Sequence, residues 1–160
     1  MEHPTPAQTQ ANVFPAPYPA ASKTTSGLVN GRLTNITSMA FSDKIVITIT
    51  QAGKLAHWVH VPLATISADP MNPGHVSNGA SENSLLPMSH LTATTVLGGT
   101  KRDDEVIGQT LATTIGSAIL MKRQHEERLL VVGLGLEDAA GSMTGRAHFE
   151  EAVGLVLHVL

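Results

Sequence analysis

The sequence predicts an α+β domain with an antiparallel sheet of about six strands and two helices packed on one face, in the order βββββαβα. Three observations predict this fold class. Between residues 27 and 61, short apolar stretches alternate with turn residues, as in consecutive antiparallel strands joined into a meander. Between residues 107 and 119, isoleucine and leucine recur every four positions, which is typical of an amphipathic helix. The strongly apolar run 129–136 follows this helix and predicts one more strand.

The ordered domain is expected to begin near Gly27. Residues 1–26 hold five of the nine prolines, with Ala, Thr, Ser and Gln between them. Such a segment buries too little apolar surface to offset its ordering entropy, so we predict a disordered tail followed by a single domain over residues 27–160. Residues 62–89 are rich in Pro, Asn, Ser and Gly, and they are predicted to form a long flexible loop at the surface.

The strands are predicted from their turn residues and their β-branched residues. Asn30 and Gly31 stand between two short apolar stretches, which is the pattern of a type I′ hairpin turn. Residues 44–50 form the clearest strand, with three isoleucines on one face and a valine and two threonines on the other. The further strands are expected at residues 33–41, 55–61, 90–97 and 128–137.

Two helices are predicted, and both follow the fifth strand. Asp103 or Asp104 is expected to supply the N-cap of a helix that ends near Lys122. The second helix is expected over residues 142–156, with one apolar stripe formed by Phe149, Ala152, Val153 and Val156.

The composition excludes several classes of function. Hydrophobic residues make up 42% of the 160 residues and charged residues only 14%, well below the roughly 25% of an average globular protein. A net charge of −3 provides no basic footprint, so neither nucleic acid nor a membrane is expected as a partner. The chain has no cysteine, which excludes disulfides, a thiolate nucleophile and cysteine-ligated metals. No signal-peptide pattern opens the sequence, and the run 129–136 is shorter than the about 20 residues that span a bilayer. We therefore expect a soluble protein of the cytoplasm and also of the nucleus.

No residue pattern predicts a catalytic, cofactor-binding or metal site. His57 and His60 are three positions apart on a predicted strand, so they point to opposite faces and cannot share a metal. Gly133 and Gly135 resemble a fragment of a dinucleotide fingerprint, but they lie within a strand, where close packing against a bulky neighbour is the better interpretation. Residues 98–101 lack the spacing of a phosphate-binding loop. We expect no catalytic residue, no cofactor and no metal ligand.

Two features instead predict a protein partner. The run 129–136 is apolar on both faces, as in a strand covered on both sides, whereas two helices cover only one face of a sheet. Gly108, Ala112 and Gly116 recur every four positions and form a small-residue ridge, which permits close packing either within the subunit or against a partner. The candidate partner interface comprises Trp58, Gly108, Ala112, Gly116, Val132 and Leu134.

Several stretches resemble the proteasome assembly chaperone 3 family, in the same order along the chain. The resemblance covers residues 34–61 and 92–160. Its most specific marks are Phe41-Ser42, Thr50-Gln51-x-Gly53-Lys54, Val96-Leu97-Gly98 and Ser142-Met143. It implies a non-catalytic assembly factor for the 20S proteasome α-ring, which forms a dimer with the related assembly chaperone 4 or with itself. It also implies that the dimer binds α-subunits early and leaves before the particle matures. The sister chaperone has a similar fold, so the choice between the two stays open.

Two alternatives belong to other classes of protein. A dimeric scaffold of the roadblock or longin type, serving GTPase-regulator or trafficking complexes, shares the plan of one sheet and few helices. Those folds usually place a long helix between early strands, whereas here both helices follow five strands. A small enzyme with a site completed across a dimer interface would need polar residues that converge near Trp58, His60 or His90.

Overall fold

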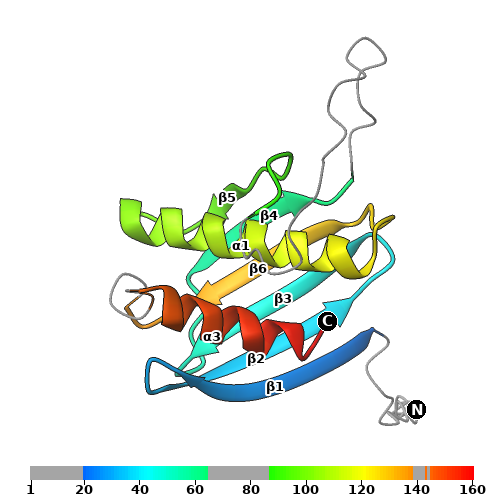
Figure 1. Ribbon diagram of the computed structural model, residues 1–160. Helices are drawn as coiled ribbons and strands as arrows, with labels where there is room; N and C mark the ends of the chain where they lie inside the picture. Colours follow the sequence, from blue (N-terminus) through cyan, green and yellow to red (C-terminus); the bar gives the residue numbers. More distant parts are fainter. Residues whose placement is uncertain (1–19, 65–86, 139–142, 144) are drawn as a thin grey trace, which may run out of the picture.

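The computed structural model describes residues 20–64, 87–138, 143 and 145–160. In this part of the chain, six strands form one sheet in the order β1-β2-β3-β6-β4-β5, and two helices lie on one face of it (Figure 1). The elements are β1 (Ala21–Val29), β2 (Arg32–Ala40), β3 (Lys44–Gln51), β4 (His57–Pro62), β5 (Thr94–Leu97), α1 (Arg102–Lys122), β6 (Leu129–Gly135) and α3 (Arg146–Leu157). The predicted α+β fold class and the order βββββαβα are confirmed.

β1 and β2 form the predicted hairpin. Asn30 and Gly31 have φ values of 49° and 71°, and a type I′ turn requires positive values at both central residues. β1 starts at Ala21, which corrects the expected start of the domain near Gly27. The first part of β1 is polar and mostly exposed. All nine residues of β1 nevertheless pair with β2, and the backbone hydrogen bonds of this pairing order the strand. Residues 1–19 of the predicted tail lie outside the described residues, as do residues 65–86 of the predicted loop.

The centre of the sheet differs from the simple meander that the sequence predicts. β6 lies between β3 and β4, parallel to β3 and antiparallel to β4, so β3 and β4 are not neighbours. The predicted alternation of β3 is confirmed, because Ile45, Ile47 and Ile49 are at most 3% exposed and face the helices. Leu130 and Val132 of β6 add to the same core.

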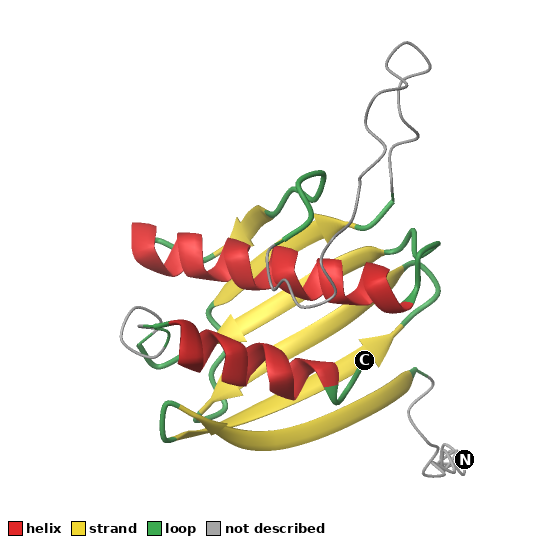
Figure 2. Cartoon of the chain, in the orientation of Figure 1, coloured by secondary structure: helices red, strands yellow, loops and turns green. Residues whose placement is uncertain are grey.

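Both helices cover the same face of the sheet (Figure 2). α1 packs mainly on β4, α3 packs on β1, and the two helices contact each other. Asp103 and Asp104 do not cap α1 as predicted: they lie in its first turn, where their charges favour the helix N-terminus, and the cap residue Lys101 makes no side-chain cap hydrogen bond. β5 begins at Thr94 and α3 at Arg146, each four residues later than predicted. No helix in the described part of the chain is long and apolar enough to cross a membrane.

A buried ion pair fixes the connection between α1 and β6. The Glu126 side chain is 8% exposed, and its carboxylate accepts hydrogen bonds of 2.7 Å from both Nε and Nη2 of Arg128. Nη1 of Arg128 also donates to the carbonyl oxygen of Phe41 at 2.8 Å, which ties this connection to the turn between β2 and β3. Hydrogen bonding to the Arg128 guanidinium lowers the pKa of Glu126 to about 2. The pair therefore positions the start of β6 next to β3.

Candidate partner-binding face

The small-residue ridge of α1 is a contact within the subunit. Ala112 is 0% exposed. A Cβ atom added to Gly108 would lie 2.3 Å from Cε1 of His57, and one added to Gly116 would lie 3.2 Å from Cδ2 of Leu63. The ridge thus lets α1 approach β4 closely. This corrects the assignment of these three residues to a partner interface.

Val132 and Leu134 also belong to the core. They are 0% and 4% exposed and lie on the side of β6 that the helices cover. Trp58 differs from the other five candidate residues, because it points to the opposite face of the sheet and is partly exposed. We call this opposite side the open face: it is the face of the sheet that no described helix covers (Figure 2). Of the six predicted interface residues, only Trp58 lies there.

The strand register defines the open face. Its side chains alternate with the buried ones along β1, β2, β3, β4 and β6, while an irregularity in the pairing of β4 with β5 shifts the alternation in β5. They are Ser22, Thr24, Ser26 and Leu28 of β1, Leu33, Asn35, Thr37 and Met39 of β2, Lys44, Val46, Thr48 and Thr50 of β3, Leu129, Val131 and Gly133 of β6, Trp58, His60 and Pro62 of β4, and Thr94 and Leu97 of β5. Apart from His60, Lys44 is the only residue of this set with an acidic or basic side chain, so the open face is nearly uncharged.

The middle of the open face is apolar. Val46 of β3 and Val131 of β6 are directly opposite each other, and Met39 of β2 pairs with Val46 on the other side. Leu129 lies two positions before Val131 on the same face. All four side chains are half-buried by their neighbours within the sheet, and no described element packs on top of them. A row of this kind favours burial against a second surface.

The two margins of the open face are also apolar. Leu28 and Leu33 form a cross-strand pair beside the hairpin turn and are 64% and 61% exposed. At the opposite edge, Leu97 pairs with Trp58 and is 64% exposed. The open face therefore has an apolar centre and two apolar margins, and polar side chains such as Asn35, Thr37 and Thr48 lie between the Leu28–Leu33 pair and the centre.

The indole of Trp58 lies flat on a glycine. Gly133 is its cross-strand partner, and a Cβ atom added there would lie 2.8 Å from Cζ3 and 2.9 Å from Cη2 of the indole. This confirms the prediction that a glycine within the last strand marks close packing against a bulky neighbour. Because the indole occupies the space above Gly133, it lies low on the sheet and leaves the open face without a large protrusion.

Polar side chains at the β1 side of the open face bond to one another across the strands. The hydroxyl groups of Thr24 and Thr37 are 3.2 Å apart, and Oγ of Ser26 donates to Oδ1 of Asn35 at 2.7 Å. A partner can cover these groups without leaving them unpaired, because each hydroxyl already has a hydrogen-bond partner.

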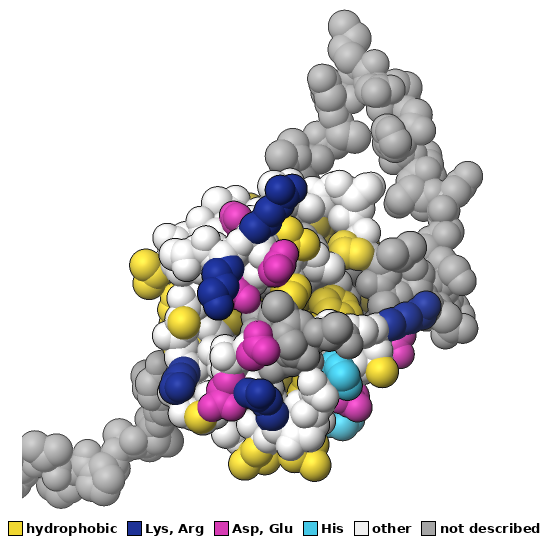
Figure 3. Space-filling model, turned by 90° about the vertical axis from the view of Figure 1, so that its left-hand side faces the viewer, with side chains coloured by type: hydrophobic (Ala, Val, Ile, Leu, Met, Phe, Trp, Pro, Cys, Tyr) yellow, Lys and Arg dark blue, Asp and Glu magenta, His cyan; other side chains and the backbone are white. Residues whose placement is uncertain are grey.

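In the described part of the chain, neither a cluster of like charges nor a set of metal ligands indicates a further site. At the end of the molecule seen in Figure 3, basic and acidic side chains lie beside one another and form no cluster of one sign. Within the described ranges, no group of three His, Asp or Glu residues could hold a metal ion. His57 and His60 point to opposite faces as predicted, because His57 is buried under α1 while His60 lies on the open face.

A sequence signal for the open face existed in the strand at residues 44–50. The isoleucine face of this strand predicts the core, and its second face carries Val46, Thr48 and Thr50 beyond Lys44. On a central strand, a second face that carries no charge beyond its first residue indicates a covered surface. Extending the same alternation to Leu129 and Val131 would have identified the centre of the face.

Comparison with known proteins agrees with this architecture. The chain matches the family model described as proteasome assembly chaperone 3 over residues 47–145, which is more than half of its length. A similar fold occurs in a structure titled as the crystal structure of a novel chaperone complex for yeast 20S proteasome assembly, with a TM-score of 0.51 and 12% sequence identity over 86% of this chain and 95% of that chain. At this identity the likeness concerns the fold. No curated protein matches the chain. The family match shows that the chain belongs to the proteasome assembly chaperone 3 family.

Proposed function

We propose that this protein is a non-catalytic assembly chaperone of the 20S proteasome α-ring that works as a dimer through its open face. In this proposal the dimer binds α-subunits early in ring formation and leaves before the particle matures, in the cytoplasm and in the nucleus. Family membership supports the role of an assembly chaperone, and the open face is the observation that supports dimer formation.

The occupant that best fits the open face is a second sheet of the same kind. Two sheets that pack face to face lie about 10 Å apart, and their short side chains interdigitate. The open face offers Val, Thr, Met and Leu side chains at regular spacing and carries a single lysine at one end. Charged residues are depleted in the centre of protein interfaces, as they are here. We therefore assign this face to the related assembly chaperone 4, or to a second copy of this chain.

The structure of the similar chaperone complex supports the same assignment. Its title describes a complex for yeast 20S proteasome assembly, and one of its chains has this fold along 95% of its length. A dimer that buries the open faces would expose α1 and α3 of each chain on its outer surfaces. We propose that these outer surfaces and the strand edges contact α-subunits, and that later subunits displace the chaperone by competing for them.

The decisive substitution is Val131→Lys, at the centre of the open face. In the isolated chain the new ammonium group can reach water across the uncovered face, so the fold is retained. In the complex it would be buried without a partner, which typically costs several kcal/mol and would weaken dimer formation at least about 100-fold. Thr110→Lys is the matched control, because Thr110 is exposed on α1 and far from the open face.

The experiment is affinity purification of the tagged full chain from cells that assemble proteasomes, followed by identification of the bound proteins. The unchanged chain should recover the related chaperone, or a second copy, together with α-subunits, and the Thr110→Lys variant should recover the same chaperone partner, which is the readout that this control serves. Val131→Lys should lose the chaperone partner while its circular dichroism spectrum stays unchanged. Recovery of no proteasome subunit by the unchanged chain would contradict the proposed function. Full recovery by Val131→Lys would contradict the role of the open face.

A further inference from the structure

One ionisable side chain lies beside the apolar centre of the open face. His60 of β4 pairs with Val131 of β6 on one side and with Thr94 of β5 on the other. Along β4, Trp58 and Pro62 are its neighbours on the same face, because side chains two positions apart in a strand point the same way. His60 is half-buried by these neighbours, and no described element packs on top of it. A second sheet that covers Val131 therefore also covers His60.

No carboxylate of the open face can pair with His60. Among the described residues that define this face, none is an aspartate or a glutamate. Lys44 is the other ionisable residue of the face, but it lies at the start of β3, where its Nζ is 2.9 Å from Oδ2 of Asp43. The neighbours of His60 on this face carry no ionisable group: they are Trp58 and Pro62 of β4, Thr94 and Leu97 of β5, and Leu129, Val131 and Gly133 of β6. A proton on His60 thus adds a positive charge without a partner.

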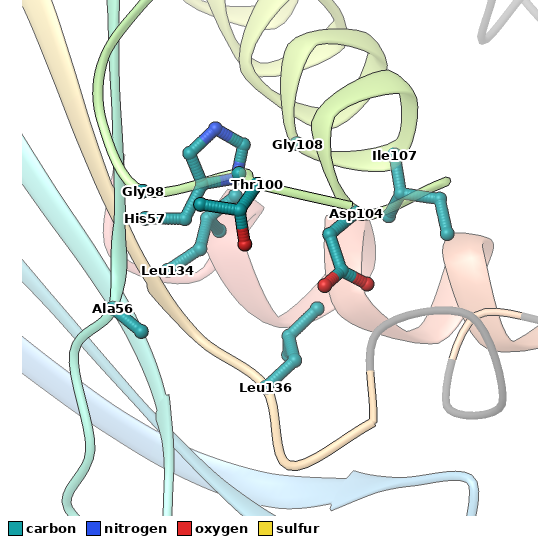
Figure 4. A pocket seen from close by; sticks show the side chains of 10 residues that line it. Ala56, His57, Gly98, Thr100, Asp104, Ile107, Gly108, Leu134 and Leu136 are labelled. Atoms are coloured by element: carbon teal, nitrogen blue, oxygen red, sulfur yellow. The ribbon is translucent and has the colours of Figure 1, made fainter. Parts of the chain in front are cut away.

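The second histidine of β4 lies on the opposite side of the sheet. His57 is 7% exposed and borders a pocket of about 260 Å³ between the start of β4, the β5–α1 connection and the first turns of α1 (Figure 4). A Cβ atom added to Gly108 would lie 2.5 Å from Nδ1 of His57, so α1 covers this ring closely. Burial lowers the pKa of His57. This histidine belongs to the interior of the subunit, and His60 is the histidine that a partner on the open face would contact.

We propose that His60 makes the association of the open face with a second sheet dependent on pH: the dimer forms when the His60 ring is neutral and is weakened when the ring is protonated. This inference rests on the proposed function, because it takes the open face as the dimer interface. A neutral imidazole can exchange hydrogen bonds with threonine hydroxyl groups, which a face of this kind carries. A buried imidazolium needs a carboxylate, and a second sheet of the same kind offers none.

The size of the effect follows from the linkage between protonation and binding. Histidine is the side chain whose charge ordinarily changes between about pH 8 and about pH 5. When only the neutral form binds, each pH unit below the range in which a free imidazole titrates weakens binding about tenfold. Between pH 7.5 and pH 5.5 the dissociation constant should rise about 10-fold for one His60 in the interface. It should rise about 100-fold for a dimer of two copies, which buries two such rings.

The test is a measurement of the dissociation constant at pH 7.5 and at pH 5.5 by fluorescence anisotropy. The labelled full chain is titrated with the partner that the affinity purification recovers, either the purified related chaperone or the unlabelled full chain. His60→Gln is the test variant, because glutamine keeps a donor and an acceptor but gains no charge. His125→Gln is the matched control, because His125 is exposed in the connection between α1 and β6, outside the open face. Circular dichroism at both pH values verifies that each chain stays folded.

We expect the unchanged chain and His125→Gln to bind at least about 10-fold more weakly at pH 5.5 than at pH 7.5. His60→Gln should reduce this ratio by about 10-fold or more, whatever other groups of the partner titrate. An equal pH dependence of His60→Gln and the unchanged chain would overturn the proposal. Tighter binding of the unchanged chain at pH 5.5 would also overturn it, because it would reveal a carboxylate of the partner opposite His60.

Val131→Lys distinguishes failure of this inference from failure of the proposed function. If Val131→Lys binds at pH 7.5 as tightly as the unchanged chain, the open face is not the interface, and both the proposed dimer and the role of His60 are wrong. If Val131→Lys loses binding while His60→Gln keeps the full pH dependence, the open face remains the interface and only the role of His60 is wrong.

Discussion

Glu126→Gln is expected to destabilise the domain by about 2 kcal/mol and by no more than about 3 kcal/mol, because it breaks the ion pair that positions the start of β6. Hydrogen bonding to Arg128 lowers the pKa of Glu126 from 4.5 to about 2, which sets an upper limit of about 3 kcal/mol of stability at pH 7, because solvent screens the partly exposed guanidinium. Removing one partner of a fully buried pair costs more, roughly 3–5 kcal/mol. Glu127→Gln is the matched control, since Glu127 is the exposed neighbour in sequence.

The assay for this prediction is equilibrium unfolding in urea at several pH values. At pH 7 the midpoint of Glu126→Gln should fall by about 1–2 M, while that of Glu127→Gln stays within about 0.3 M of the unchanged chain. The folded-state pKa of Glu126 lies below its unfolded value, so the stabilisation is present above about pH 4.5 and is lost as the pH falls toward 2. The difference between Glu126→Gln and the unchanged chain should shrink over that range. Equal midpoints for both variants at pH 7 would refute the reasoning.

Three further substitutions test the assignment of residues to core, turn and surface. Ala112→Arg should unfold the isolated chain or lower its melting temperature by more than 10 °C, because it places a charge in a fully buried contact. The control Thr110→Arg should change the melting temperature little, and thermal unfolding followed by circular dichroism measures both variants. Gly135→Ala should destabilise by at least about 2 kcal/mol in urea unfolding, because its Cβ would collide with the carbonyl oxygen of Lys54, and stability within 0.5 kcal/mol of the unchanged chain would contradict this close approach. Arg32→Ala should cost less than about 1 kcal/mol in the same assay, since its ion pair with a glutamate is exposed.

The local structure could largely be predicted from the sequence. The hairpin of β1 and β2 could be predicted from Asn30 and Gly31, because both residues tolerate the positive φ that a type I′ turn requires. The β-branched alternation in β3 determines which side chains are buried. The packing of Gly133 against a large side chain also followed from its place within a strand, although the identity of Trp58 as that neighbour did not.

The arrangement of the elements could not be predicted in the same way. β6 inserts between β3 and β4, and the pairing of two strands separated by α1 depends on tertiary contacts that local patterns do not encode. The ridge that contains Ala112 is buried for the same reason: α1 contacts β4 on one side and α3 on another, and periodicity does not identify which neighbour a stripe meets. The polar residues 21–26 form a strand only because β2 provides a full-length partner.

The pocket beside His57 is a feature that the sequence does not reveal. In the sequence, His57 and His60 are spaced wrongly for a shared metal, and residues 98–101 are spaced wrongly for a phosphate-binding loop, so neither segment indicates a site. The structure brings His57 together with Gly99, Gly108 and Leu134 from four separate segments. The spacing of these residues along the sequence does not indicate that they lie together, so the pocket can be identified only from the three-dimensional structure.

The central claim, that the open face is covered by a second sheet, is tested most directly at Trp58. It is the only tryptophan of the chain, so incorporation of 5-fluorotryptophan places one ¹⁹F probe on the open face. On addition of the unlabelled related chaperone, or on raising the concentration if the chain pairs with itself, we predict a shifted ¹⁹F resonance that no longer responds to a soluble paramagnetic quencher. Val131→Lys should abolish this change. A complex that forms while the ¹⁹F resonance stays unshifted and exposed to the quencher would contradict the account.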